Sequence, residues 1–131
     1  MTRVTFACML LLLLSGVADA QQKQVLAADV FEKAIAQPGV QLLDVRSPGE
    51  YTTGYIQGAV NANWQDLPAF TGKVVKLDKT KAVYVYCLSG GRSGQAMDWL
   101  SEHGFSSVYN LEGGVRGWTA ASKKLVIPSA K

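Results

Sequence analysis

Residues 82–93 read AVYVYCLSGGRS, and this stretch decides the fold of the chain. Its first part, 82–86, is dense in β-branched and aromatic residues, which is typical of a buried strand. Residues 93–103 carry apolar side chains at helical spacing, and Gly104 is a natural end for a helix there. The stretch therefore predicts a strand and a helix joined by a short glycine-rich loop.

Strand-like and helix-like segments alternate along the rest of the chain. Short apolar runs bounded by turn residues predict buried strands, and apolar stripes at helical spacing predict helices. We expect strands at 40–45, 59–62, 82–86 and 107–111, helices at 27–37, from Ser47, at 64–70, 93–103 and 114–122, and a loop at 73–81. This alternation predicts an α/β fold, a parallel sheet with helices on both faces.

Two polar segments follow predicted strands. Asp44-Val45-Arg46 ends the first of these strands, and Cys87 opens the loop after the strand at 82–86. Ligands of parallel α/β sheets bind beyond the carboxyl ends of the strands, so we expect both segments on one rim. Residues 47–50 (Ser-Pro-Gly-Glu) have the pattern of a helix start with a capping box.

The loop has the composition of an anion-binding nest around a nucleophilic sulfur. Gly90 and Gly91 allow backbone conformations in which successive N–H groups point inward, and a helix N-terminus adds positive potential. We expect this environment to lower the pKa of the Cys87 thiol, Arg92 to supply a planar cation for an oxyanion, and Ser93 to cap the helix. The sulfur must be reachable from solvent for this chemistry. A tight turn followed by a solvated arginine is the alternative interpretation.

Composition limits the kinds of protein this chain can be. It has 131 residues, enough for a single domain, with 48% hydrophobic and 18% charged residues, which excludes general disorder. The net charge is +3 and the basic residues are scattered, which argues against nucleic-acid binding. Two cysteines and one histidine are too few for the usual four-ligand zinc site.

The first twenty residues have the pattern of a cleaved signal peptide. Arg3 precedes an apolar stretch with five consecutive leucines, and Ala18-Asp19-Ala20 suits a signal peptidase. The stretch is about 14 residues, which is short for a stable membrane span; a core helix or an uncleaved anchor is the alternative. We therefore expect a mature domain at 21–131 with its core at about 26–122, exported to a bacterial periplasm. Removal of Cys8 leaves Cys87 as the only cysteine, either a reactive thiol or a buried inert one.

The sequence resembles the single-domain rhodaneses, a thiosulfate sulfurtransferase-like family. The matching segments are Leu43–Arg46 with Glu50-Tyr51, Gly54–Ala59 with Asn61, Cys87–Ser93, and Glu112–Gly114 with Trp118. Two positions depart from the family pattern, because Tyr55 and Gln57 stand where histidine and proline are frequent. We expect these differences to alter the rim of the site and not its chemistry.

The resemblance implies a rhodanese-like fold and sulfur transfer in two steps. Cys87 takes the outer sulfur of thiosulfate or a similar small anionic donor as a persulfide, and a thiophilic acceptor, cyanide or a thiol, then removes it. The implied substrate-binding residues are Leu88, Ser89, Gly90, Gly91, Arg92 and Ser93, with Arg92 on the donor's sulfonate. The resemblance implies neither a metal nor an organic cofactor.

Three alternatives share parts of this pattern. A cysteine phosphatase also uses a thiolate, an amide-lined loop and an arginine, but its loop has five residues between Cys and Arg, and here there are four. A non-catalytic docking domain and a sulfur carrier loaded by a protein partner are the others. Around the loop we expect Asp44 to orient it through backbone amides, and Arg46 and Glu50 to form an ion pair on the rim.

Overall fold

The computed structural model describes residues 21–128, which form one five-stranded parallel sheet with the strand order β1-β5-β4-β2-β3. The strands are β1 (Gln22–Leu26), β2 (Gln41–Asp44), β3 (Val60–Asn61), β4 (Val83–Tyr86) and β5 (Ser107–Leu111). The helices are α1 (Ala28–Ile35), α2 (Pro48–Tyr51), α3 (Leu67–Val74), α4 (Gly91–Glu102) and α5 (Gly114–Ala120). The predicted α/β fold is confirmed.

The edge strand β1 was missed by the sequence analysis. It pairs with β5 along five residues, yet four of its five side chains are exposed. An edge strand with polar side chains on both faces has no apolar alternation, and alternation was the signal used to find strands. Its sequence, QKQVL, also fits the edge position, since polar and charged side chains discourage pairing with other chains.

Both ends of helix α3 differ from the prediction. Helix α3 begins at Leu67 because Asp66 caps it, its carboxylate accepting a hydrogen bond from the Ala69 N–H group. It runs into the segment expected to be a loop and ends at Val74. Trp64 precedes the helix and packs edge-to-face on Phe70.

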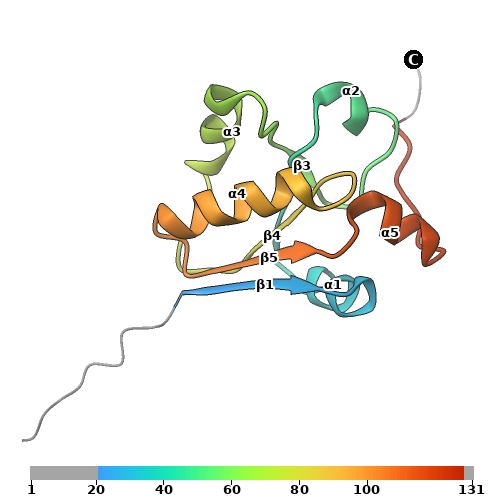
Figure 1. The fold of residues 1–131 in the computed structure, drawn as a ribbon, viewed down its shortest axis with the longest axis horizontal. Helices are drawn as coiled ribbons and strands as arrows, with labels where there is room; N and C mark the ends of the chain where they lie inside the picture. Colours follow the sequence, from blue (N-terminus) through green and yellow to red (C-terminus); the bar gives the residue numbers. More distant parts are fainter. Residues whose placement is uncertain (1–20, 129–131) are drawn as a thin grey trace, which may run out of the picture.

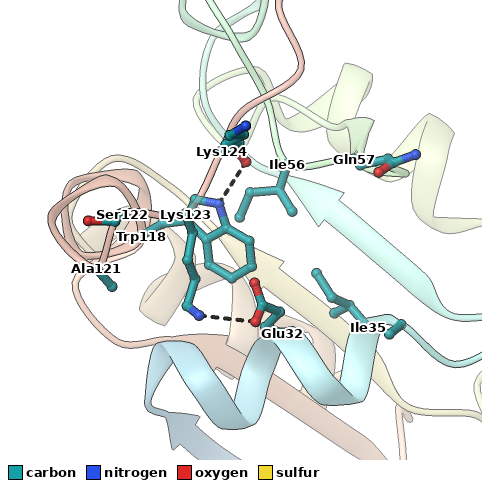
Figure 2. A pocket seen from close by; sticks show the side chains of 10 residues that line it. Glu32, Ile35, Ile56, Gln57, Trp118, Ala121, Ser122, Lys123 and Lys124 are labelled. Atoms are coloured by element: carbon teal, nitrogen blue, oxygen red, sulfur yellow. Dashed lines mark hydrogen bonds and ion pairs between the residues drawn. The ribbon is translucent and has the colours of Figure 1, made fainter.

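Helices cover both faces of the sheet (Figure 1). On one face, α1 and α5 contribute the buried side chains Phe31, Val115 and Trp118 to a core cluster. Figure 2 shows the outer side of this layer, where Trp118 donates a hydrogen bond to the Lys124 carbonyl beside an open hollow of about 720 Å³. No residue of the 87–93 loop lines this hollow.

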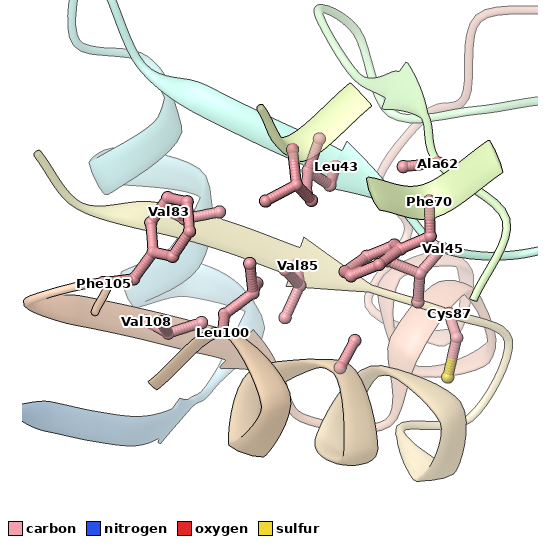
Figure 3. Packing of buried hydrophobic residues seen from close by; sticks show 12 residues of the cluster. Leu43, Val45, Ala62, Phe70, Val83, Val85, Cys87, Leu100, Phe105 and Val108 are labelled. Carbon is pink, nitrogen blue, oxygen red and sulfur yellow. The ribbon is translucent and has the colours of Figure 1, made fainter. Parts of the chain in front are cut away.

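The second core cluster lies between the sheet and helices α3 and α4 (Figure 3). Phe70 from α3 and Leu100 from α4 pack there on the valines of β2's end, β4 and β5. Cys87 also belongs to this cluster and lies just beyond the carboxyl end of β4. The core thus fixes the base of the loop in which the predicted nucleophile stands.

One end of the sheet gathers the segments that the sequence analysis placed on one rim. The strand arrows of Figure 1 end at the side where α2, the loop before α4 and the start of α5 lie together. Within residues 21–128 no helix has the length and apolar character needed to cross a membrane. The predicted signal peptide, residues 1–20, lies outside the described part of the chain.

Candidate active site

The sulfur of Cys87 is surrounded by hydrogen-bond donors of its own loop. The Gly90 N–H group donates to Sγ at 3.1 Å, and the Ser93 hydroxyl donates to Sγ at 3.2 Å. Figure 3 shows the sulfur pointing toward the first turn of α4. The first N–H groups of a helix have no partners within the helix, so this turn presents positive potential to the sulfur.

These donors shift the ionisation of the thiol. Burial raises the pKa of Cys87, because it disfavours a charged sulfur. Hydrogen bonds from the Ser93 hydroxyl and from the N–H groups of Ser93, Gly90 and Ser89 act in the opposite direction and outweigh burial. The pKa of the thiol therefore lies below its ordinary value, as the loop composition predicted.

The thiol of Cys87 is buried, whereas the sequence predicted a sulfur that solvent can reach. Cys87 is only 1% exposed, although Ser89 and Gly91 of the same loop are exposed. The sulfur is packed beneath the loop because β4 ends inside the core cluster and not at the surface. Solvent therefore reaches very little of the Cys87 surface in this conformation.

Ser93 does not cap α4, so that prediction was wrong. The helix begins two residues earlier, at Gly91, and its N-cap is Gly90 in the left-handed region at φ 108°. Gly90 makes this turn possible, since other residues rarely adopt such a φ. Ser93 is instead completely buried, and its hydroxyl faces the sulfur.

A buried asparagine on β5 was not predicted as part of the site. Asn110 is 4% exposed, and its Nδ2 donates to the Gly90 carbonyl at 3.3 Å. In a trans peptide the carbonyl and the following N–H group point in opposite directions. Asn110 therefore helps fix the direction of the Gly91 N–H group. The sequence signal for it was a polar residue at a buried strand position, in SVYNL.

The start of α5 holds the loop from the other side. The N–H groups of Val115 and Arg116 donate to the carbonyls of Cys87 and Leu88 at 2.9 and 3.0 Å. Gly114 makes this approach possible, because its φ is 56° and a side chain there would stand 2.6 Å from the Leu88 carbonyl carbon. The Gly-Gly pair before Val115 thus serves close backbone packing against the nucleophile.

Arg92 is bound to Glu50, and the predicted Arg46–Glu50 pair was wrong. The Arg92 guanidinium donates to the two Glu50 carboxylate oxygens at 2.7 and 2.9 Å, although 42 residues separate them. The hydrogen bond from Arg92 is the main cause that lowers the pKa of Glu50 to about 2. The predicted capping box is present, since Glu50 N–H bonds to the Ser47 hydroxyl and Ser47 N–H to the Glu50 carboxylate.

Arg46 and Asp44 form a buried ion pair instead. Arg46 donates through Nε at 3.0 Å and Nη2 at 2.6 Å to the Asp44 carboxylate, and Nη2 also reaches the Gly54 carbonyl at 2.6 Å. Asp44 was expected to accept hydrogen bonds from backbone amides of the loop. Its carboxylate instead accepts hydrogen bonds from the side chain and the backbone N–H group of Arg46. The pair ties β2 to the segment after α2 and supports the rim indirectly.

No metal site is apparent in the described part of the chain. Among residues 21–128 no three His, Cys, Asp or Glu side chains are grouped closely enough to hold an ion. The groups that surround the Cys87 sulfur are hydrogen-bond donors, which suit a bound anion and not a cation.

Known proteins match this chain both in sequence and in structure. The family described as the rhodanese-like domain matches residues 27–121. A thiosulfate sulfurtransferase of Shewanella oneidensis is 36% identical over 83 residues, which cover 63% of this chain and 79% of that protein. The crystal structure of a rhodanese-related protein from Thermoplasma volcanium has a TM-score of 0.69 at 28% identity, over 79% of this chain and 98% of that one.

Other relatives are much longer than this chain. A tRNA uridine(34) hydroxylase of Aster yellows witches'-broom phytoplasma is 37% identical over 93 residues. The match covers 69% of this chain and 30% of that protein, so the chain spans less than a third of its length. The family match covers most of this chain and includes Cys87, Arg92 and the residues that hold them. The chain therefore belongs to the rhodanese-like domain family.

Proposed function

We propose that this protein is a sulfurtransferase that carries a sulfane sulfur as a persulfide on Cys87. It takes the sulfur from thiosulfate or a similar donor and passes it to cyanide or a thiol. The observation that carries the proposal is the Cys87 sulfur, held by the Gly90 N–H group and the Ser93 hydroxyl at the start of α4. The thiosulfate sulfurtransferase name of a relative supports the same reaction.

The first step is a displacement at sulfur. The Cys87 thiolate attacks the outer sulfur of thiosulfate, the new Sγ–S bond forms, and the S–S bond of the donor breaks with its electron pair leaving on sulfite. Donors that already surround the thiolate need little reorganisation to hold the negative charge once it has moved to the outer sulfur. The N–H groups of Gly91 and Arg92 belong to the first turn of α4 and have no partners within the helix, so they can stabilise that charge.

The second step regenerates the thiolate. A nucleophile such as cyanide attacks the outer sulfur and leaves as thiocyanate, and the electron pair of the Sγ–S bond returns to Cys87. The same loop serves both steps, because a thiolate and a persulfide anion differ by one sulfur atom at the same place. A loop with four residues between Cys87 and Arg92 offers fewer amides than a phosphatase loop, which favours a sulfur atom over a phosphoryl group.

The assay for this proposal is thiocyanate formation from thiosulfate and cyanide. We expect turnover that depends on both substrates, with sulfite released before cyanide is consumed, as a two-step reaction with a covalent intermediate requires. Aryl phosphate hydrolysis serves as the comparison reaction. Phosphate release with no thiocyanate would replace the proposal with a phosphatase, and no product from either assay would favour a docking domain.

Ionisation of the thiol gives a pH prediction. Because the pKa of Cys87 lies below its ordinary value, the thiolate persists to a lower pH than in an ordinary free thiol and is lost as the pH falls further. We expect the rate of sulfur uptake to reach its plateau at a lower pH than the reaction of an ordinary free thiol would, and to decline in acid. The ultraviolet absorbance of the thiolate, measured as a difference from Cys87→Ser, checks this directly. A midpoint at or above that of a free thiol would contradict the role of the loop donors.

We also propose that the protein acts outside the cytoplasm. The support is the order of features in residues 1–20, a basic start, an apolar stretch and Ala18-Asp19-Ala20. Expression with the complete N-terminus in a bacterium should place the protein in the periplasm with Gln21 as its first residue. Recovery from the cytoplasm with residues 1–20 intact would overturn this proposal and leave the sulfur chemistry unaffected.

A further inference from the structure

The carboxylate of Glu50 is bound to the Arg92 guanidinium, the cation that an anionic sulfur donor would need. Both Nη groups of Arg92 bond to its carboxylate, and the two side chains are 23% and 32% exposed, so water screens the pair only in part. Arg92 is the only cationic side chain of the 87–93 loop. A sulfonate that is to bind Arg92 must therefore displace a carboxylate already seated in the same bidentate geometry.

Glu50 is itself held in place and does not swing freely. It is the third residue of α2, and its Oε1 accepts a hydrogen bond from the Ser47 hydroxyl at 3.1 Å while its N–H group donates back to that hydroxyl. With its pKa lowered to about 2, it stays ionised at any physiological pH. The carboxylate is a fixed negative charge on the rim of the loop.

The neighbouring guanidinium groups do not replace Arg92. Arg46 is buried in its pair with Asp44. Arg116, whose N–H group bonds to Leu88, has an exposed side chain with no ion pair among residues 21–128, and solvent screens its charge. The one guanidinium of the loop is thus already paired with a carboxylate, and neither neighbouring arginine supplies a second cation that is shielded from solvent.

We propose that Glu50 sets donor specificity by holding Arg92, so that the site favours a persulfide on an uncharged thiol over the thiosulfate dianion. This inference rests on the proposed sulfur transfer and names its preferred donor class. The step balances as follows: the Cys87 thiolate attacks the outer sulfur of RS–SH, the Sγ–S bond forms, and the RS–S bond breaks with its electron pair leaving on the thiolate RS⁻. The proton of the transferred sulfur is then lost to solvent, which leaves the same persulfide anion on Cys87 that thiosulfate would give.

The test compares two donors within each variant. Loading of Cys87 is followed by intact mass in single-turnover experiments, with thiosulfate and with the persulfide of 2-mercaptoethanol, and the two second-order rate constants are expressed as a ratio. Glu50→Gln keeps the capping box, because glutamine serves it as well as glutamate, and removes the charge that holds Arg92. We expect the thiosulfate-to-persulfide ratio to rise about tenfold, equivalent to about 1.4 kcal/mol.

Two further variants make the result specific. Glu112→Gln removes one exposed carboxylate next to Gly113, which packs at the same rim, and leaves Arg92 untouched; its ratio should stay within about twofold of wild type. Arg92→Ala leaves Glu50 without its cation and should lower the ratio below wild type. Both measurements use ratios within one protein, so a change in the amount of folded protein cancels.

The outcomes separate this inference from the function on which it rests. An unchanged ratio in Glu50→Gln, or an equal rise in Glu112→Gln, would overturn the role of Glu50 while sulfur transfer stands. A wild-type ratio that favours thiosulfate would overturn the proposed donor class. If wild-type protein gains sulfur from neither donor, the proposed function fails and the inference falls with it.

Discussion

Cys87→Ser is expected to abolish thiocyanate formation, with a loss of at least about a thousandfold. The serine hydroxyl does not ionise near neutral pH, and an oxygen at this position cannot form the Sγ–S bond that stores the sulfur. The donors from Gly90 and Ser93 remain available to the hydroxyl, so the loop keeps its hydrogen bonds. Steady-state thiocyanate production and intact mass after donor treatment are the measurements.

Folding of this variant is the necessary control. Serine is slightly smaller than cysteine, so its thermal unfolding midpoint should lie within a few degrees of wild type, since one small change in a core cluster costs about 1 kcal/mol. Thiocyanate production by folded Cys87→Ser within about tenfold of wild type would contradict the assignment of the nucleophile.

Gly114→Ala is expected to damage both stability and activity. The methyl group would overlap the backbone of Cys87 and Leu88, and alanine would be held at a φ of 56°, so strain and overpacking add to a loss of about 2–4 kcal/mol in the free energy of unfolding. Urea unfolding measures the loss. Sulfur uptake should also fall in the protein that remains folded, because α5 can no longer donate to the loop carbonyls.

Gly72→Ala is the matched control for this substitution. Gly72 lies on the exposed side of α3 with a helical backbone and no atom within 4 Å of the added methyl group. Alanine there should leave stability unchanged or raise it by up to about 1 kcal/mol, since alanine favours helices. Equal effects of the two substitutions would show that close packing of Gly114 on the loop has no special importance.

Local pattern predicted most of the elements that build the site. The run at 82–86 became β4, the short apolar run at 40–45 became β2, and the capping box at Ser47 and Glu50 formed as expected. Each of these signals lies within a few neighbouring residues, where propensity and capping act. Prediction failed at β1, because an exposed edge strand owes its conformation to hydrogen bonds with β5 and not to its own side chains.

The partners of the polar residues could not be found in this way. Glu50 was placed correctly on the rim, but its partner is Arg92, 42 residues further along the chain, and Arg46 turned inward to Asp44. The hydrogen bond from Asn110 to Gly90 joins β5 to the loop before α4 across 20 residues. Charge pattern shows which residues are polar, and only the packing of β2, β4 and β5 decides which of them meet.

The burial of Cys87 follows from the same packing. A residue that ends a strand within the core cluster is covered, whatever the composition of the loop after it. The site therefore combines a thiol of lowered pKa with restricted access. In the proposed reaction, such an arrangement would protect the persulfide from solvent nucleophiles between the two steps, and the loop would have to admit donor and acceptor in turn.

The most direct test of this account is the mass of the protein after brief treatment with a sulfane sulfur donor and removal of the excess. Sulfur transfer through Cys87 predicts a gain of one sulfur atom, located on the peptide that contains Cys87 and lost as thiocyanate when cyanide is added. A protein that stays at its original mass with both thiosulfate and an organic persulfide, while remaining folded, would contradict the account.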